Sequence, residues 1–143
     1  DIELWVRLAL NTGWRFEGIE DSLTFYRVNA SGLSANLEKQ YESWQFAMQK
    51  NRIGHEDFFK QWFSLANAYQ KRYLSRRAIQ SNNGFDAIRL SFSALVTNPK
   101  ILIQEPFKTT ITLFCAVLSS LPKGIYNRIQ RISMNMIGKY YLA

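Results

Sequence analysis

The chain has 143 residues, of which 47% are hydrophobic and 20% are charged, so the composition predicts a globular protein and excludes an intrinsically disordered one. Its single cysteine, Cys115, excludes a disulfide framework and a cysteine-based zinc site, and fits a reducing compartment. The formal net charge of +7 indicates an anionic partner for at least part of the chain.

This charge is divided unevenly along the sequence. Residues 1–50 hold five basic and seven acidic side chains, whereas residues 51–143 hold thirteen basic and only four acidic ones. The division predicts two functional parts, the second of which faces a phosphate-bearing ligand, a nucleic acid or anionic lipid head groups.

The first elements in chain order are a helix and two short strands. Apolar residues at helical spacing predict a helix over residues 1–12, with Gly13 as its C-cap. Bulky and polar residues then alternate over 14–19 and again over 23–28, separated by a polar turn, which is typical of a β-hairpin. Because the first five residues read as the middle of an element, we expect the chain to be part of a longer protein.

From residue 34 onward the apolar spacing is helical, and Gly and Pro residues mark the breaks. Gly54 and the pair Asn98-Pro99 are the clearest of these breaks. The expected helices cover 34–51, the segment from Phe58 to Arg77, 85–96, the apolar run 109–121, and a last amphipathic segment with Ile125, Ile129, Ile132 and Met136 on one stripe.

These elements predict a mainly α-helical chain with one short β-hairpin. A helix followed by two strands cannot close a core alone, so we expect residues 1–34 to be the end of an α/β domain and residues 35–143 to be an α-helical C-terminal region.

The N-terminal motif is the most specific pattern in the sequence. It consists of Asp1, Glu3, Leu4, Trp5, Arg7, Leu8, Gly13, Trp14, Phe16, Ile19, Leu23, Tyr26 and Arg27. This motif closely resembles family 2 glycosyltransferases, many of whose bacterial members carry Glu-Asp-x-Asp-Leu-Trp-x-Arg-Leu, then Gly-(aromatic)-x-Phe, then Tyr-Arg. The resemblance covers about the first 34 residues and extends more weakly to the helical tail of some bacterial members.

The resemblance implies that the chain is the C-terminal part of an α/β glycosyltransferase A-type fold that transfers a hexose-type unit from a nucleotide-sugar to an acceptor hydroxyl, with inversion. By position, Asp1 takes the place of the general base, which removes the proton of the attacking hydroxyl. Glu3 takes the second acidic place, and Arg7 lies one helical turn further on, where it can orient a carboxylate. Arg27 and Asn29 are candidates for contact with an acceptor or a phosphate, and Asn29 stands where the family often has His.

The donor side of such an enzyme is missing from this sequence. The chain holds neither the Asp-x-Asp-type motif that binds nucleotide and metal nor a glycine-rich phosphate loop. We therefore expect no metal site in this chain, a divalent metal (Mg or Mn) in the full-length enzyme, and no activity of the chain alone. The resemblance implies a sugar or lipid-linked acceptor, and a cytoplasmic location that includes the inner face of the membrane.

Each of these residues also has a plainer interpretation. Asp1 is then an acid favoured by the helix dipole, Glu3 and Arg7 form an ordinary surface pair, and Arg27 is a solvated strand end. Large aromatic side chains usually supply buried area, so Trp5 and Trp14 are predicted to lie in the core.

Two further side chains are expected to have no chemical role. His55, which has no second His or Cys near it in the sequence, is interpreted as a capping or surface residue, and Cys115 as a buried, inert thiol.

A basic cluster is the candidate for anion contact in the tail. Three interpretations stay open for it: a solvated helix end, a nucleic-acid contact, or contact with an anionic membrane surface. No nucleic-acid-binding signature accompanies it, so we rank nucleic acid lowest. Residues 107–121 are too short to span a bilayer, and either lie in its interface or pack on the catalytic domain. The alternative to the enzyme is thus a non-catalytic helical module that binds an anionic membrane or a protein partner. The basic cluster consists of Lys71, Arg72, Arg76 and Arg77.

Overall fold

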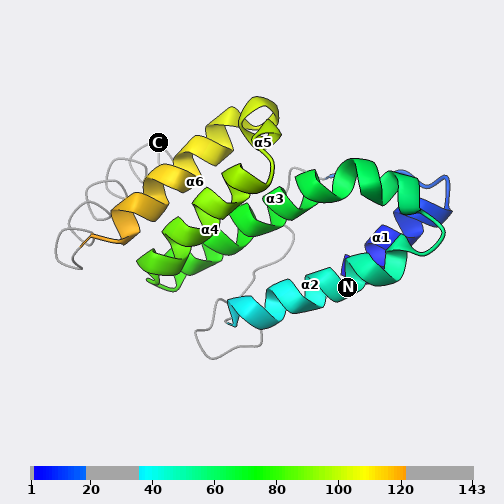
Figure 1. Ribbon diagram of the computed structural model, residues 1–143, viewed down its shortest axis with the longest axis horizontal. Coiled ribbons are helices and arrows are strands. Elements are labelled where there is room, and N and C mark those ends of the chain that lie inside the picture. The colour runs from blue at the N-terminus through cyan, green and yellow to red at the C-terminus, as the bar shows by residue number, and fades with distance from the viewer. Residues whose placement is uncertain (1, 19–35, 122–143) are drawn as a thin grey trace, which may run out of the picture. The chain divides into compact units, whose positions relative to one another are not determined.

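Every regular element in residues 2–18 and 36–121, which the computed structural model describes, is an α-helix (Figure 1). The chain forms two compact units, Asp1–Ser64 and Leu65–Ala143. One long helix, Glu56–Gln80, begins in the first unit and ends in the second. The domain boundary predicted at residue 34 lies outside the described residues and stays a prediction.

The predicted fold class is wrong for the part of the chain that the structure describes. Residues 14–18 form no strand, and no sheet of the glycosyltransferase A-type fold is present among the described residues. The physical reason is that an alternating segment needs neighbouring strands for its backbone groups, and an isolated two-stranded hairpin is marginal in water. The rest of the predicted hairpin, residues 19–28, lies outside the described residues.

The first unit contains α1 (Ile2–Asn11) and α2 (Leu37–Arg52), which pack against each other. The side chain of Asn36 caps α2 by accepting a hydrogen bond from the backbone N–H of Lys39 at 2.9 Å. Gly54, at a φ of 82°, then allows the tight turn that leads into the next helix. The helix predicted over 1–12 and the break at Gly54 are thus confirmed.

An apolar stripe of α2 is buried. Trp44 and Met48 are buried, and the indole of Trp44 stacks on Tyr41 at 6.1 Å and on Phe63 at 5.7 Å between ring centroids. Stacked aromatic pairs at these distances add to the free energy of burial. Phe63 belongs to α3 (Glu56–Gln80).

The predicted burial of two tryptophans is wrong. Trp5 is 54% exposed, because α1 has only ten residues and buries none of them fully. Trp14, which follows α1 and belongs to no regular element, is 70% exposed. Cys115 is half-buried rather than fully buried.

The second unit combines the end of α3 with α4 (Gly84–Thr97), α5 (Lys100–Gln104) and α6 (Pro106–Ser119). Its core cluster consists of Leu65, Ala68, Ala94 and Ile101, with Tyr69 and Leu95 packed against it. α4 ends at Asn98-Pro99 as predicted. The short helix α5 follows it, where no helix was predicted.

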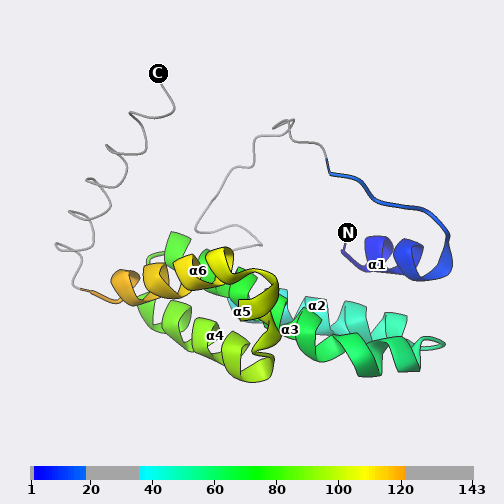
Figure 2. The ribbon, with the colours of Figure 1, turned by 90° about the horizontal axis from the view of Figure 1, so that it is seen from above.

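Small residues hold α4 close to its neighbours. The hydroxyl of Ser75 on α3 lies 2.8 Å from the carbonyl oxygen of Ala87 and 2.7 Å from the hydroxyl of Ser91, so these buried polar groups satisfy one another. α4 and α6 lie side by side in both views and run in opposite directions, with Gly84 against the backbone of Ser119 (Figures 1 and 2).

Candidate functional site

The acidic start of α1 is held by two cations. The guanidinium of Arg7 lies 3.3 Å from the carboxylate of Glu3, so the predicted pair one helical turn apart is present. The ammonium of Lys50, which comes from α2, lies 3.1 Å from the same carboxylate. Spacing along α1 predicted the first contact, whereas the second depends on helix packing and could not be predicted.

This arrangement changes the chemistry of Glu3. The hydrogen bond from Lys50, and the charges of Lys50 and Arg7, hold the pKa of the Glu3 carboxyl below its ordinary value. A carboxylate stabilised in this way is a poorer proton acceptor than an ordinary one. Glu3 therefore fits an orienting role, and the proton-accepting role predicted for Asp1 falls on a residue outside the described ones.

An aromatic contact joins the two sequence motifs in this region. The rings of Trp5 and Phe16 meet edge to face, with centroids 5.6 Å apart. Trp5 belongs to the acidic motif on α1, and Phe16 belongs to the Gly-Trp-x-Phe motif that follows it. Arg27 and Asn29, the candidates for acceptor or phosphate contact, lie outside the described residues.

His55 precedes α3 and faces α1. Its Nε2 atom lies 3.3 Å from the side-chain oxygen of Asn11, and its carbonyl oxygen accepts the first backbone hydrogen bond of α3 from Phe59. The structure thus places His55 at a helix start, as the capping interpretation predicts.

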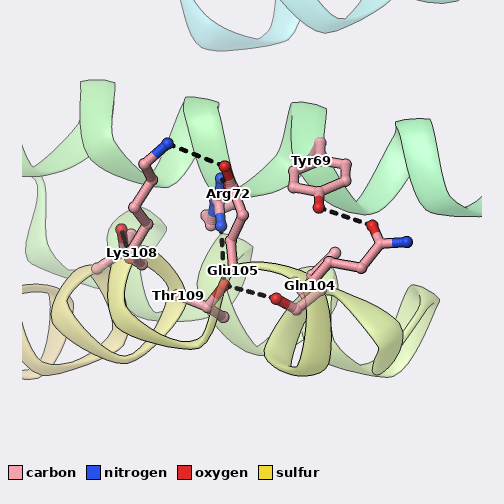
Figure 3. A network of polar contacts seen from close by, with 8 residues as sticks. Tyr69, Arg72, Gln104, Glu105, Lys108 and Thr109 are labelled. Carbon is pink, nitrogen blue, oxygen red and sulfur yellow. Dashed lines mark hydrogen bonds and ion pairs between the residues drawn. The ribbon is translucent and has the colours of Figure 1, made fainter.

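In the basic cluster, Arg72 is bound inside the protein. Its guanidinium forms an ion pair with Glu105 and donates a hydrogen bond of 2.8 Å to the hydroxyl of Thr109 (Figure 3). The same group lies 4.9 Å from the centre of the Tyr69 ring, at cation–π distance.

The partner carboxylate lies at the corner between α5 and α6. Glu105 also accepts a hydrogen bond of 2.9 Å from Lys108, and the hydroxyl of Tyr69 donates to Gln104 at 2.9 Å (Figure 3). The bonds from Arg72 and Lys108 hold the pKa of the Glu105 carboxyl below its ordinary value. Sequence reasoning missed Glu105, since a single acid before Pro106 carries no recognisable motif.

The remaining members of the basic cluster differ in exposure. Lys71 donates a hydrogen bond of 2.8 Å to Thr97, and burial lowers the pKa of its ammonium group. Arg77 is buried and donates to the side chain of Gln80 at 2.8 Å, whereas Arg76 is exposed. The basic cluster therefore does not present four cations on one surface: Arg72 and Arg77 are directed into the protein.

Neither a metal site nor a membrane-spanning helix is present in the part of the chain that the structure describes. Across residues 2–18 and 36–121, no group of three or more His, Cys, Asp or Glu side chains is placed to hold a metal ion. None of the helices described is both long enough and apolar enough to cross a bilayer.

Comparison of the chain with models of protein families, with curated proteins and with solved structures found no match.

Proposed function

We propose that the chain is the C-terminal, acceptor-side part of an enzyme that transfers a hexose-type sugar from a nucleotide-sugar donor to an acceptor hydroxyl, with inversion. The observation behind this proposal is the acidic start of α1, where Glu3 is held ionised by Arg7 and Lys50. The Trp5–Phe16 contact supports it, because the two segments that resemble family 2 glycosyltransferases lie against each other.

The two acids at the N-terminus of the chain have different roles in this proposal. A sugar hydroxyl is a weak nucleophile until its proton is removed, so attack on the anomeric carbon needs a general base. Asp1 takes this role and accepts the proton as the acceptor oxygen bonds to the anomeric carbon. The bond from that carbon to the nucleoside diphosphate breaks in the same step, and the nucleoside diphosphate leaves. Glu3 and Arg7 are positioning residues that keep the start of α1 in place.

Other parts of the enzyme supply the donor site. In the full-length enzyme, a divalent metal, Mg or Mn, would bind the nucleotide diphosphate. The described residues of this chain do not fit a metal. The acceptor is a sugar or a lipid-linked sugar, and the location is the cytoplasm, including the inner face of the membrane.

The test is transfer by the full-length protein with Asp1→Asn. We expect kcat to fall about 10²–10⁴-fold, the usual contribution of a general base, while donor binding measured by calorimetry is unchanged. Glu17→Gln is the matched control, since it removes an exposed carboxylate nearby and is expected to leave turnover as it is.

Unchanged turnover of the Asp1→Asn protein would overturn the assignment of the base. If the gene segment before Asp1 also encodes no Asp-x-Asp motif, the enzyme proposal fails. The non-catalytic helical module, which binds an anionic membrane or a protein partner, then becomes the better account.

A further inference from the structure

The large apolar side chains of α6 lie on its outside. Phe107 is 80% exposed and Phe114 is 63% exposed, and Ile111 lies between them on the same face. The buried face of α6 is instead made of small or polar residues: Thr109, Thr112 and Ala116. This distribution is the reverse of that in an ordinary helix of a globular protein.

The inner face of α6 is complete without the large residues. The hydroxyl of Thr109 donates to the carbonyl oxygen of Ile101 at 3.1 Å, and that of Thr112 donates to the backbone carbonyl oxygen of Lys108 at 2.7 Å. Small residues on this face let α6 approach α4 closely, as at Gly84. The phenylalanines are therefore not needed for packing within the second unit and are left for a surface outside it.

Neighbouring elements also expose large apolar side chains. Ile103 of α5 is 82% exposed. α4 shows the same reversed distribution, with Ala87 and Ala94 buried and Phe85 and Phe92 exposed. We define the α6 face as Phe107, Ile111 and Phe114.

The charge around the α6 face is positive. Residues 65–121 contain only two acidic side chains, and both are in ion pairs: Asp86 with Arg89, and Glu105 with Arg72 and Lys108. Lys108, directly after Phe107, is exposed, and Lys100, at the start of α5, is exposed as well. An anionic surface is thus the complementary partner.

We propose that the α6 face docks on an anionic lipid surface, with Phe107, Ile111 and Phe114 in the interfacial layer and Lys100 and Lys108 at the head groups. Burial of apolar area and attraction of basic side chains to anionic lipid act together in such helices. α6 has 14 residues, about 21 Å at 1.5 Å per residue, so it is long enough to lie on a bilayer but too short to cross it.

Charge also favours an anionic membrane over two other occupants of the α6 face. A second copy of the chain joined through a twofold axis would bring the basic side chains around this face close to those of the partner copy. Residues 122–143 carry four basic and no acidic side chains, so they too would add like charge. An anionic membrane offers both an apolar layer and the opposite charge.

The test is co-sedimentation of the 143-residue chain with vesicles of phosphatidylcholine, alone or with about one-third phosphatidylserine. We expect binding to the anionic vesicles at low salt that weakens as salt screens the charges. The double variant Phe107→Ser/Phe114→Ser is expected to bind at least about tenfold more weakly. Phe46→Ser is the matched control, because Phe46 is exposed on α2 and lies outside the α6 face.

A second pair of variants tests the charge. Lys100→Gln is expected to weaken binding to anionic vesicles about fivefold, which corresponds to about 1 kcal/mol for one basic residue at such a surface. Lys60→Gln, at an exposed position of α3 in the first unit, is the control and is expected to bind like the parent chain.

Three results would overturn the proposal. The first is no binding to anionic vesicles at low salt, and the second is binding that the double variant leaves unchanged. The third is a double variant that changes the chain from dimer to monomer in ultracentrifugation, because a second copy then covers the α6 face. A double variant that melts well below the parent chain counts in the same way, because residues 122–143 then cover this face. None of these measurements involves a sugar donor, so a failure here is distinguishable from a failure of the proposed transferase function.

Discussion

Arg72 is the residue at which the polar contacts of the second unit meet. Its guanidinium binds Glu105 and Thr109 and lies over the ring of Tyr69, while only 11% of its side chain is exposed. A cation held this deeply is costly to leave unpaired and stabilising once it is paired and hydrogen-bonded. The most basic segment of the sequence thus has a structural use that its composition did not indicate.

Replacement of Arg72 should therefore cost more than replacement of its neighbour in the same network. We expect Arg72→Met to lower the free energy of unfolding by about 2–4 kcal/mol, since it leaves the Glu105 carboxylate without its main partner. Lys108→Met removes a cation from the same carboxylate, but this side chain is 67% exposed, so the loss should stay below about 1 kcal/mol. Urea unfolding followed by circular dichroism measures both, and equal small losses would contradict the role given to Arg72.

At the scale of elements, the sequence predicted where helices end but not which face lies inside. Asn98-Pro99 and Gly54 end helices through backbone chemistry that is local to them. Helical spacing likewise groups Phe107, Ile111 and Phe114 on one face, yet spacing alone does not predict whether that face packs against the core or is exposed. The Arg72–Glu105 pair joins residues 33 positions apart and became visible only with the packing of α3 on the α5–α6 corner.

The close approach of α4 and α6 gives a prediction at this scale. A Cβ atom added to Gly84 would lie 2.6 Å from the carbonyl carbon of Ser119, and backbone cannot move aside as a side chain can. We expect Gly84→Ala to destabilise the protein by about 1–3 kcal/mol, although Gly→Ala in a helix otherwise stabilises by up to about 1 kcal/mol. Gly13→Ala, where a Cβ would meet nothing within 4 Å, is the control for thermal melting. A higher melting temperature for Gly84→Ala would show that the two helices are not in contact there.

For the whole molecule, positive charge and a few paired carboxylates set the response to acid. The formal net charge is already +7 at pH 7, so further protonation increases self-repulsion. Among the residues that the structure describes, three carboxyls have a pKa below the ordinary value near 4.5: Glu3 through Lys50, Glu56 through backbone N–H groups of its own residue and of Gly54, and Glu105 through Arg72. Each is ionised more readily in the folded than in the unfolded chain.

The direction of the pH effect follows from linkage. A carboxyl whose pKa is lower in the folded state contributes stability above its unfolded pKa, and this contribution is lost as the pH falls through the folded pKa. We therefore expect the urea midpoint of the parent chain to fall as the pH is lowered from about 5 toward 3. Glu105→Gln should be less stable than the parent chain at pH 7, because Arg72 loses its anionic partner. The difference between the two should shrink as the pH falls, because protonation of Glu105 in the folded parent chain removes the contribution of its ionised form. Self-repulsion acts on both proteins and largely cancels in that difference, so two parallel curves would show that the ionised Glu105 does not stabilise the fold.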